Sequence, residues 1–229
     1  MKRFTLSLFI LFVVYHVNAQ TNLSGAYGYS VKPGINANNN AKDVTGASGN
    51  LVLQRMEGNK YRFWLDVNIG APSYNMGETD GTLVFVNDTA SHDNTFEGSA
   101  NSCILHFKVS GATITISSNG SSSDCGFGNN VSANGNYKKL KTQPVINNEW
   151  LKKEYPEAAT IGITADKTEI FQDEDVHHSF NPKQYFTKGQ SMPGIVQTET
   201  MIYTEYITSS GKFMYGWIKK SDTKIVKSE

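Results

Sequence analysis

The chain has 229 residues, of which 21 are basic and 21 are acidic, so its formal net charge is zero. That length leaves room for one large domain or two small ones. Because the composition has no basic excess, it argues against binding to nucleic acid or to anionic lipid surfaces.

The beginning of the chain is typical of a secretory leader. Lys2 and Arg3 precede an apolar run from Phe4 through Val14, and the small-residue site Val17-Asn18-Ala19 follows it. We expect cleavage after Ala19, so that residues 1–19 form a signal peptide and the mature protein is secreted or periplasmic. The run is much shorter than the roughly 20 residues that cross a bilayer, so no membrane span is expected. An uncleaved N-terminal anchor is the alternative.

Residues 20–141 are expected to form an all-β domain, because short alternating apolar runs are broken there by Gly, Asn, Asp and Ser. An eight-stranded antiparallel barrel is favoured because closure removes exposed sheet edges, and a sandwich is the alternative. The expected strands are Ala26–Val31, Leu51–Met56, Tyr61–Val67, Thr82–Val86, Asn94–Glu97, Cys103–Val109, Thr113–Ser117 and Val131–Tyr137.

Cys103 and Cys125 are the two cysteines of the chain. An even count in an exported protein points to a disulfide. Closing a loop of this size stabilises a fold by about 3 kcal/mol in the chain-entropy model. Their spacing is unlike the Cys-x-x-Cys arrangement of redox sites. Phe127, between Gly126 and Gly128, is expected to plug one end of the barrel, and an exposed binding finger is the alternative.

Signs of catalysis are weak. His106 is three residues from Cys103, which places the two side chains on opposite faces of an alternating strand, out of reach of each other. The sequence has no Gly-x-Ser-x-Gly elbow, phosphate loop or His-Glu-x-x-His pair. We therefore expect no enzymatic activity and no cofactor.

A short helix is expected in the linker, residues 142–158. Asn147 is a suitable N-cap, Glu149 lies in the first turn, lysines follow, and Pro156 ends the pattern. The helix is predicted over 147–155 and joins the two expected domains.

Residues 159–229 show strand patterns again and are expected to form a small barrel of five or six strands. The expected strands are Thr160–Thr164, a stretch through Ile170, Gln184–Thr187, Ile195–Gln197, Met201–Ile207 and Phe213–Ile218.

This C-terminal part resembles bacterial Src homology 3-like (SH3-like) domains. The resemblance is carried by Ala165–Phe171, by Lys188-Gly189 after Tyr185-Phe186-Thr187, by Tyr203–Tyr206 and by Gly216-Trp217. It implies a small barrel, and members of that family often bind cell-wall or peptide ligands. The candidate ligand-binding residues are Tyr185, Tyr203, Tyr206, Tyr215 and Trp217, because aromatic grooves suit extended peptides. Core packing is the alternative for Trp217.

The N-terminal part is similar to uncharacterised secreted bacterial β domains, some of which occur beside lysozyme-inhibitor modules. The similarity lies in Cys103-x-Leu105-x-Phe107, in Cys125-Gly126-Phe127-Gly128 and in Val131–Tyr137. It implies no activity by itself.

His177 and His178 follow Asp173, Glu174 and Asp175, so a zinc or calcium site has to be considered. Adjacent side chains diverge on a strand, and the spacing of a calcium loop is missing. A solvated acidic turn is the default, and no metal site is expected.

The sequence favours a non-enzymatic exported protein that binds a cell-envelope polymer, a peptide or a protein partner. Loops at the barrel rim and the C-terminal aromatic residues are the expected binding surfaces. An inhibitor or immunity-type protein that blocks a lysozyme or a delivered toxin is the first alternative. A cell-wall hydrolase with an unrecognised site is the second.

Overall fold

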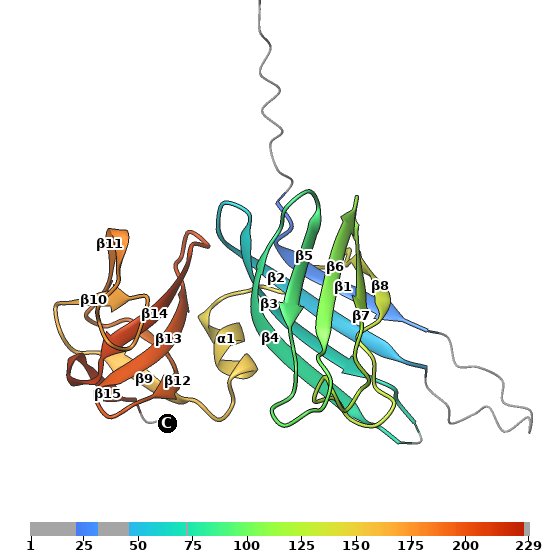
Figure 1. Cartoon of the computed structure of the whole chain (residues 1–229). Helices are drawn as coiled ribbons and strands as arrows, with labels where there is room; N and C mark the ends of the chain where they lie inside the picture. The colour runs from blue at the N-terminus through green and yellow to red at the C-terminus, as the bar shows by residue number, and fades with distance from the viewer. Residues whose placement is uncertain (1–21, 32–45, 72, 227–229) are drawn as a thin grey trace, which may run out of the picture.

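The computed structural model describes residues 22–31, 46–71 and 73–226, and it consists mostly of strands. The strands form two sheets, which are joined by a short helix (Figure 1). This confirms the all-β class. The expected signal peptide lies outside the described residues. Within those residues, no helix has the length and apolar character needed to span a membrane.

The first sheet is antiparallel and forms a nearly closed barrel, as predicted. Its strand order is β4-β3-β2-β1-β8-β7-β6-β5, which leaves β4 and β5 at the two edges of the sheet. The strands are β1 (Gly25–Ser30), β2 (Ser48–Glu57), β3 (Lys60–Asn68), β4 (Met76–Val84), β5 (Thr89–Asp93), β6 (Ile104–Ser110), β7 (Thr113–Ser118) and β8 (Gly135–Lys139).

The barrel core follows from alternation along the strands, because successive side chains point to opposite faces. Leu51 and Leu53 of β2 and Leu105 of β6 have no solvent exposure. Phe127 is buried in the same core, as expected of a plug. A Cβ at Gly77 would lie 2.4 Å from the ring of Phe127, so only glycine fits beneath it.

The fifth strand was predicted wrongly at Asn94–Glu97. The observed β5 begins at Thr89, because Asn87 and Asp88 both have positive φ angles and form a tight turn after β4. Two such residues suit the turn of a β-hairpin. The predicted segment instead lies in the loop between β5 and β6.

Between β4 and β5 the barrel has a seam. Among the described residues, the turn residues Val86 and Thr89 form the only bridge across it. The half-buried ring of His92 fills the seam from inside and meets Phe63 edge-to-face at 4.9 Å between ring centroids. A Cβ at Gly81 would lie 2.4 Å from this imidazole. The seam is therefore closed by a side chain and not by a ladder of hydrogen bonds.

Helix α1 (Asn148–Glu154) is present where the linker helix was expected. Its N-cap is Asn147, whose side chain accepts a hydrogen bond from the backbone of Trp150 at 3.0 Å. Lys152 and Glu149 form an ion pair one turn apart at 3.0 Å.

The second sheet, called the C-terminal sheet, has seven strands where five or six were predicted. The additional strand, β15 (Thr223–Ile225), pairs with β9. The order is β11-β10-β14-β13-β12-β9-β15. The other strands are β9 (Ala159–Ile163), β10 (Lys167–Phe171), β11 (Ser179–Thr187), β12 (Ser191–Gln197), β13 (Met201–Ile207) and β14 (Phe213–Lys219).

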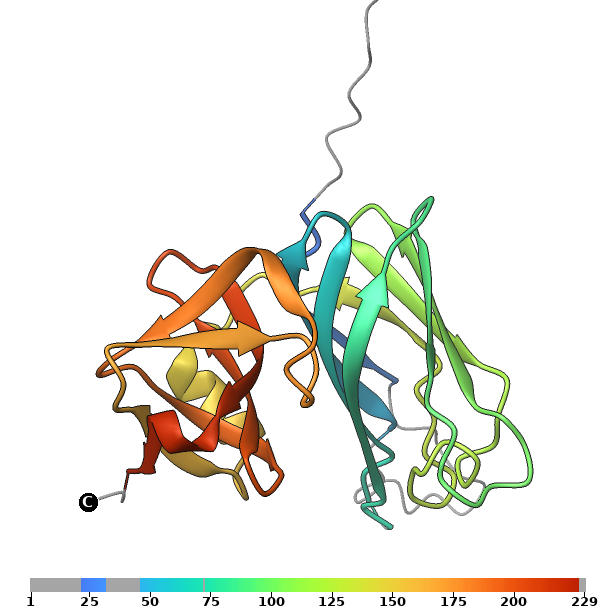
Figure 2. The same cartoon turned by 60° about the vertical axis from the view of Figure 1, so that its left-hand side comes forward.

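The barrel and the C-terminal sheet meet in an apolar cluster. Trp64 of β3, Leu151 of α1 and Phe213 of β14 are buried in it. The indoles of Trp64 and Trp150 pack edge-to-face at 4.8 Å between ring centroids. Figure 1 shows α1 between the two sheets, and Figure 2 shows the sheets side by side. The two sheets therefore share a core at this junction.

Candidate functional site

Four of the five aromatic residues expected to bind ligand lie on one face of the C-terminal sheet. Tyr203 of β13 is opposite Trp217 of β14, and Tyr215 lies two residues before Trp217. β10 pairs with β14 at the position of Trp217. On the other side of β10, its residue Glu169 is opposite Tyr185 of β11. Because cross-strand partners share a face, these four residues lie on one face of the sheet, with β10 between Tyr185 and the other three. We call them the aromatic row (Tyr185, Tyr203, Tyr215 and Trp217).

Tyr206 lies on the opposite face of the sheet. Its ring is 5.7 Å from that of Phe186, which is fully buried in the C-terminal core. Residues three apart on a strand face opposite sides, and this parity alone separates Tyr206 from Tyr203. Tyr206 is a core-packing residue in this structure.

A groove of about 480 Å³ lies at one end of the aromatic row, between the C-terminal sheet and the barrel. Tyr185 and Tyr215 line it from the C-terminal sheet, while Met56 and Glu57 of β2 line it from the barrel. We call it the junction groove. Its other lining residues are Phe180, Asn181, Pro182, Lys183, Gln184, Lys212, Phe213 and Met214.

Tyr215 is held by residues of both sheets. Its ring is stacked on Phe213 and meets Phe180 edge-to-face, at 5.9 and 5.4 Å between ring centroids. Its hydroxyl accepts a hydrogen bond of 2.9 Å from Nζ of Lys60 on β3. Because these contacts fix the ring in advance, a ligand would lose little entropy in ordering it.

Lysines outnumber carboxylates around the junction groove, which Glu57 also lines. Nζ of Lys167 lies 3.6 Å from the ring centroid of Tyr185. Lys183 pairs with Glu169 at 2.9 Å, and this partner raises the pKa of Lys183. Lys212 also lines the groove. Such a surface attracts ligands that carry carboxylates.

The aromatic row continues beyond the groove to Tyr203 and Trp217, whose rings meet at 5.6 Å between centroids. The hydroxyl of Tyr203 donates to a carboxylate oxygen of Glu205 at 3.4 Å. Burial, with help from the charge of Glu205, raises the pKa of Tyr203. This tyrosine is therefore neutral at physiological pH.

A buried ion pair lies on the same face of the C-terminal sheet as the row, at the junction of the two sheets. Nε of Arg62 on β3 is 2.7 Å from Oε1 of Glu205 on β13, which has no solvent exposure. The hydroxyl of Tyr155 accepts from Arg62 and donates to Glu205, both at 2.8 Å. Asp80 of β4 contacts Nη2 of the same guanidinium.

The surroundings of this pair shift its protonation equilibria. Burial by itself lowers the pKa of Arg62, but Glu205, Tyr155 and Asp80 outweigh it and raise that pKa. Burial raises the pKa of Glu205, and Arg62 opposes the rise. Because Glu205 is fully enclosed, a substrate cannot reach its carboxylate. The cluster is a structural contact between the sheets.

Sequence reasoning missed this ion pair. The available sign was a charged residue inside each of two largely apolar strands: Arg62 within Tyr61–Val67, which also contains Asp66, and Glu205 within Met201–Ile207. Charges in such positions are rarely buried unless they are paired. The way the two sheets pack decides which charges pair, and no local sequence pattern specifies that packing.

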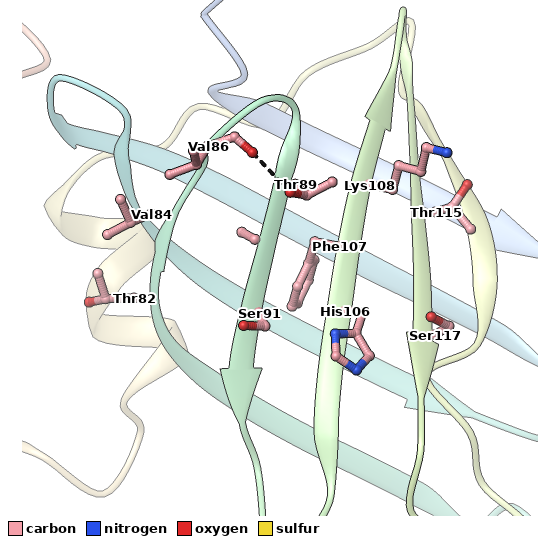
Figure 3. Close-up of a pocket in the computed structure, with 11 residues that line it drawn as sticks. Thr82, Val84, Val86, Thr89, Ser91, His106, Phe107, Lys108, Thr115 and Ser117 are labelled. Carbon is pink, nitrogen blue, oxygen red and sulfur yellow. Dashed lines mark hydrogen bonds between the residues drawn. The ribbon is translucent and has the colours of Figure 1, made fainter.

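A larger cavity of about 750 Å³ lies on the outside of the barrel along the seam. Figure 3 shows His106 and Lys108 of β6 beside the short side chains of β4, β5 and β7. Its one aromatic residue, Phe107, belongs to the barrel core and is 1% exposed. This cavity therefore offers hydroxyls, valines and two basic groups, but no exposed phenylalanine, tyrosine or tryptophan ring to anchor a ligand.

Cys103 and Cys125 form the predicted disulfide, and both are buried. Neither sulfur is a thiol, so neither can act as a nucleophile in this state. His106 is exposed on the outer face of β6, as the alternation of the strand predicts.

The imidazole of His178 contacts the carboxylate of Asp173, and the backbone of His177 donates to the same carboxylate at 3.0 Å. Within the described part of the chain, no three His, Cys, Asp or Glu side chains gather as they do around a metal ion.

Comparisons with known proteins give no relative: no family model, no curated protein and no solved structure matches this chain.

Proposed function

We propose that this chain is an exported, non-enzymatic binding protein that recognises an extended, carboxylate-bearing peptide segment of the cell envelope in the junction groove. The observation that carries the proposal is the aromatic row beside that groove. Tyr185 and Tyr215 are partly exposed, fixed in place and close to lysines.

The size and chemistry of the groove support a peptide ligand. Small-ligand sites measure roughly 300–1,000 Å³ and favour the boundaries between structural units, and the junction groove, at about 480 Å³, lies at such a boundary. Stiff aromatic rings bury a large area of an extended peptide at little entropic cost. The lysines favour a peptide that carries carboxylates, whether it belongs to a wall polymer or to an envelope protein.

The proposal also includes export of the protein and an SH3-like fold for its C-terminal part. The leader pattern at residues 1–19 supports export, and the disulfide is of the kind that persists in oxidising compartments. The resemblance of residues 159–229 to SH3-like domains supports a peptide-binding role for the aromatic row.

Binding to two probes tests the proposal, namely purified peptidoglycan fragments with intact stem peptides and synthetic acidic peptides of extended sequence. We expect Tyr185→Ala and Lys212→Gln each to weaken binding of at least one probe about tenfold, since a contact residue contributes about 1 kcal/mol or more. Lys138→Gln, an exposed charge on β8, is the matched control and should leave binding unchanged. If neither probe binds, or if the groove variants bind as the wild type does, the proposal is wrong.

A further inference from the structure

Large apolar side chains are exposed at one end of the barrel. Tyr74 is 69% exposed, Met76 59% and Phe96 58%. They come from the β3–β4 region and from the β5–β6 loop, which reach the same end of the barrel as the β7–β8 loop (Figure 1). Clustered exposed apolar groups of this kind mark interaction sites.

The loops that carry these side chains are tied together. The disulfide joins Cys103 to Cys125, and the backbone of Phe96 donates to the carbonyl of Asp124 at 2.8 Å. Gly128 donates to the carbonyl of Met76, also at 2.8 Å. The three loops therefore form one braced surface, and a partner would not have to order them.

Phe96 and the backbone of Met76 flank one short segment, residues 126–128. A Cβ at Gly126 would lie 2.9 Å from the ring of Phe96, so the ring can occupy this position because residue 126 has no side chain. Tyr74, two residues before Met76, has a φ of 52°, which is uncommon for a bulky residue. A hydrogen bond of 2.7 Å from its backbone to the carbonyl of Gly70 holds it in this conformation.

The three described segments that form this surface carry charge of one sign. Residues 73–78, 93–103 and 118–131 contain four carboxylates and no Lys, Arg or His. Hydrogen bonds from Ser121 and Ser99 lower the pKa of Asp124 to about 2, and those from Thr95 lower the pKa of Asp93. We call the three segments the acidic rim. Its carboxylates are Glu78, Asp93, Glu97 and Asp124.

We propose that the acidic rim is a docking surface for a folded basic protein and that its apolar side chains enter a cation-lined concave surface of that partner. Aromatic anchors are typical of interface hot spots, the rim around such anchors is polar, and an acidic surface steers a basic partner towards it. The same charge disfavours nucleic acids, anionic lipids and a second copy of this rim. The proposal is independent of the junction groove, which lies at the contact between the two sheets.

The test uses the full chain with a photo-reactive phenylalanine analogue in place of Phe96, exposed to an envelope extract of the producing cell. The same analogue at Val145, a 77% exposed linker residue, is the control. Capture alone does not count as support. Each protein captured from position 96 and not from position 145 is purified, and its Kd for the unmodified chain is measured at low and high salt.

Support requires a basic partner whose binding weakens as salt rises and weakens about 30-fold in Tyr74→Ala or Phe96→Ala. Both variants should melt like the wild type, because these side chains are exposed. Tyr185→Ala distinguishes the two proposals, since it changes the junction groove and leaves the rim intact. No capture over the control, capture only of acidic or neutral proteins, or binding that both rim variants retain overturns the proposal.

Discussion

Burying Arg62 and Glu205 at the sheet junction is costly, because each ion gives up its hydration. The surrounding groups compensate: Tyr155 bonds to both partners, and the guanidinium lies 5.4 Å from the ring of Trp64. An isolated charge in the same place would have no such compensation. We therefore expect the pair to make the junction selective for one arrangement of the two sheets.

We expect Glu205→Gln to lower the free energy of unfolding by about 3 kcal/mol, because it leaves the buried charge of Arg62 without its main partner. Urea denaturation followed by tryptophan fluorescence measures the loss. The double variant Arg62→Met/Glu205→Leu should recover most of the stability, since apolar residues can fill the space. Lys183→Gln, at the partly exposed pair with Glu169, should cost less than about 1 kcal/mol. An equal loss in Glu205→Gln and Lys183→Gln would contradict this account.

At the level of single residues, sequence reasoning succeeded where a local rule decided the outcome. The burial of Phe127 followed from its place between two glycines, and the disulfide followed from the count of cysteines. It failed where packing between distant segments decided the outcome, as for the partner of Arg62. Tyr206 was grouped with Tyr203 although strand parity, which is a local rule, already separates them.

Among the elements, β5 has the weakest attachment to the barrel. It pairs with β6 alone, and its inward residues are Ala90 and His92, where other strands carry leucine or phenylalanine. The residue pattern of β5 is accordingly polar, which explains why the strand was predicted several residues too late. The turn residues Asn87 and Asp88 would have located its start, because Asn and Asp tolerate the positive φ of a tight hairpin turn.

We expect acid to release β5 first. Burial lowers the pKa of His92, although Asp80 and Asp93 nearby oppose this and Arg62 reinforces it. An unfolded histidine titrates near 6.5, so the unfolded state takes up this proton first as the pH falls. The stability that neutral His92 contributes is therefore present above about pH 6.5 and declines below it, until the lower folded pKa is passed.

Hydrogen exchange at pH 7 and pH 5 measures this effect, and the amides of β5 should lose the most protection at pH 5. His92→Gln should flatten the decline in stability over the same range, whereas His106→Gln, at an exposed position of β6, should leave it unchanged. Equal pH dependence in His92→Gln and the wild type would show that another group controls the decline.

At the scale of the whole molecule, the eight-stranded sheet was predictable because most of its strands carry their own alternation. The contact between the two sheets was not, since the faces that meet there, around Trp64 and Phe213, look like ordinary strand faces until the sheets are placed together. This contact also creates the junction groove, so the candidate site is a property of the assembled molecule. Only the aromatic residues that the C-terminal sheet contributes to the site could be predicted.

Because the two sheets share a buried cluster at the junction, we expect the wild type to unfold in one cooperative transition. Trp64 is 5% exposed, packs against Trp150 and Phe213, and donates to the hydroxyl of Tyr155 at 3.1 Å. Trp64→Ala should cost about 3–5 kcal/mol and should split the transition into two, since it removes contacts between the sheets. Differential scanning calorimetry distinguishes one transition from two. Phe107→Ala, inside the barrel, should lower the melting temperature while the transition stays single, and two transitions in the wild type would show that the sheets are energetically independent.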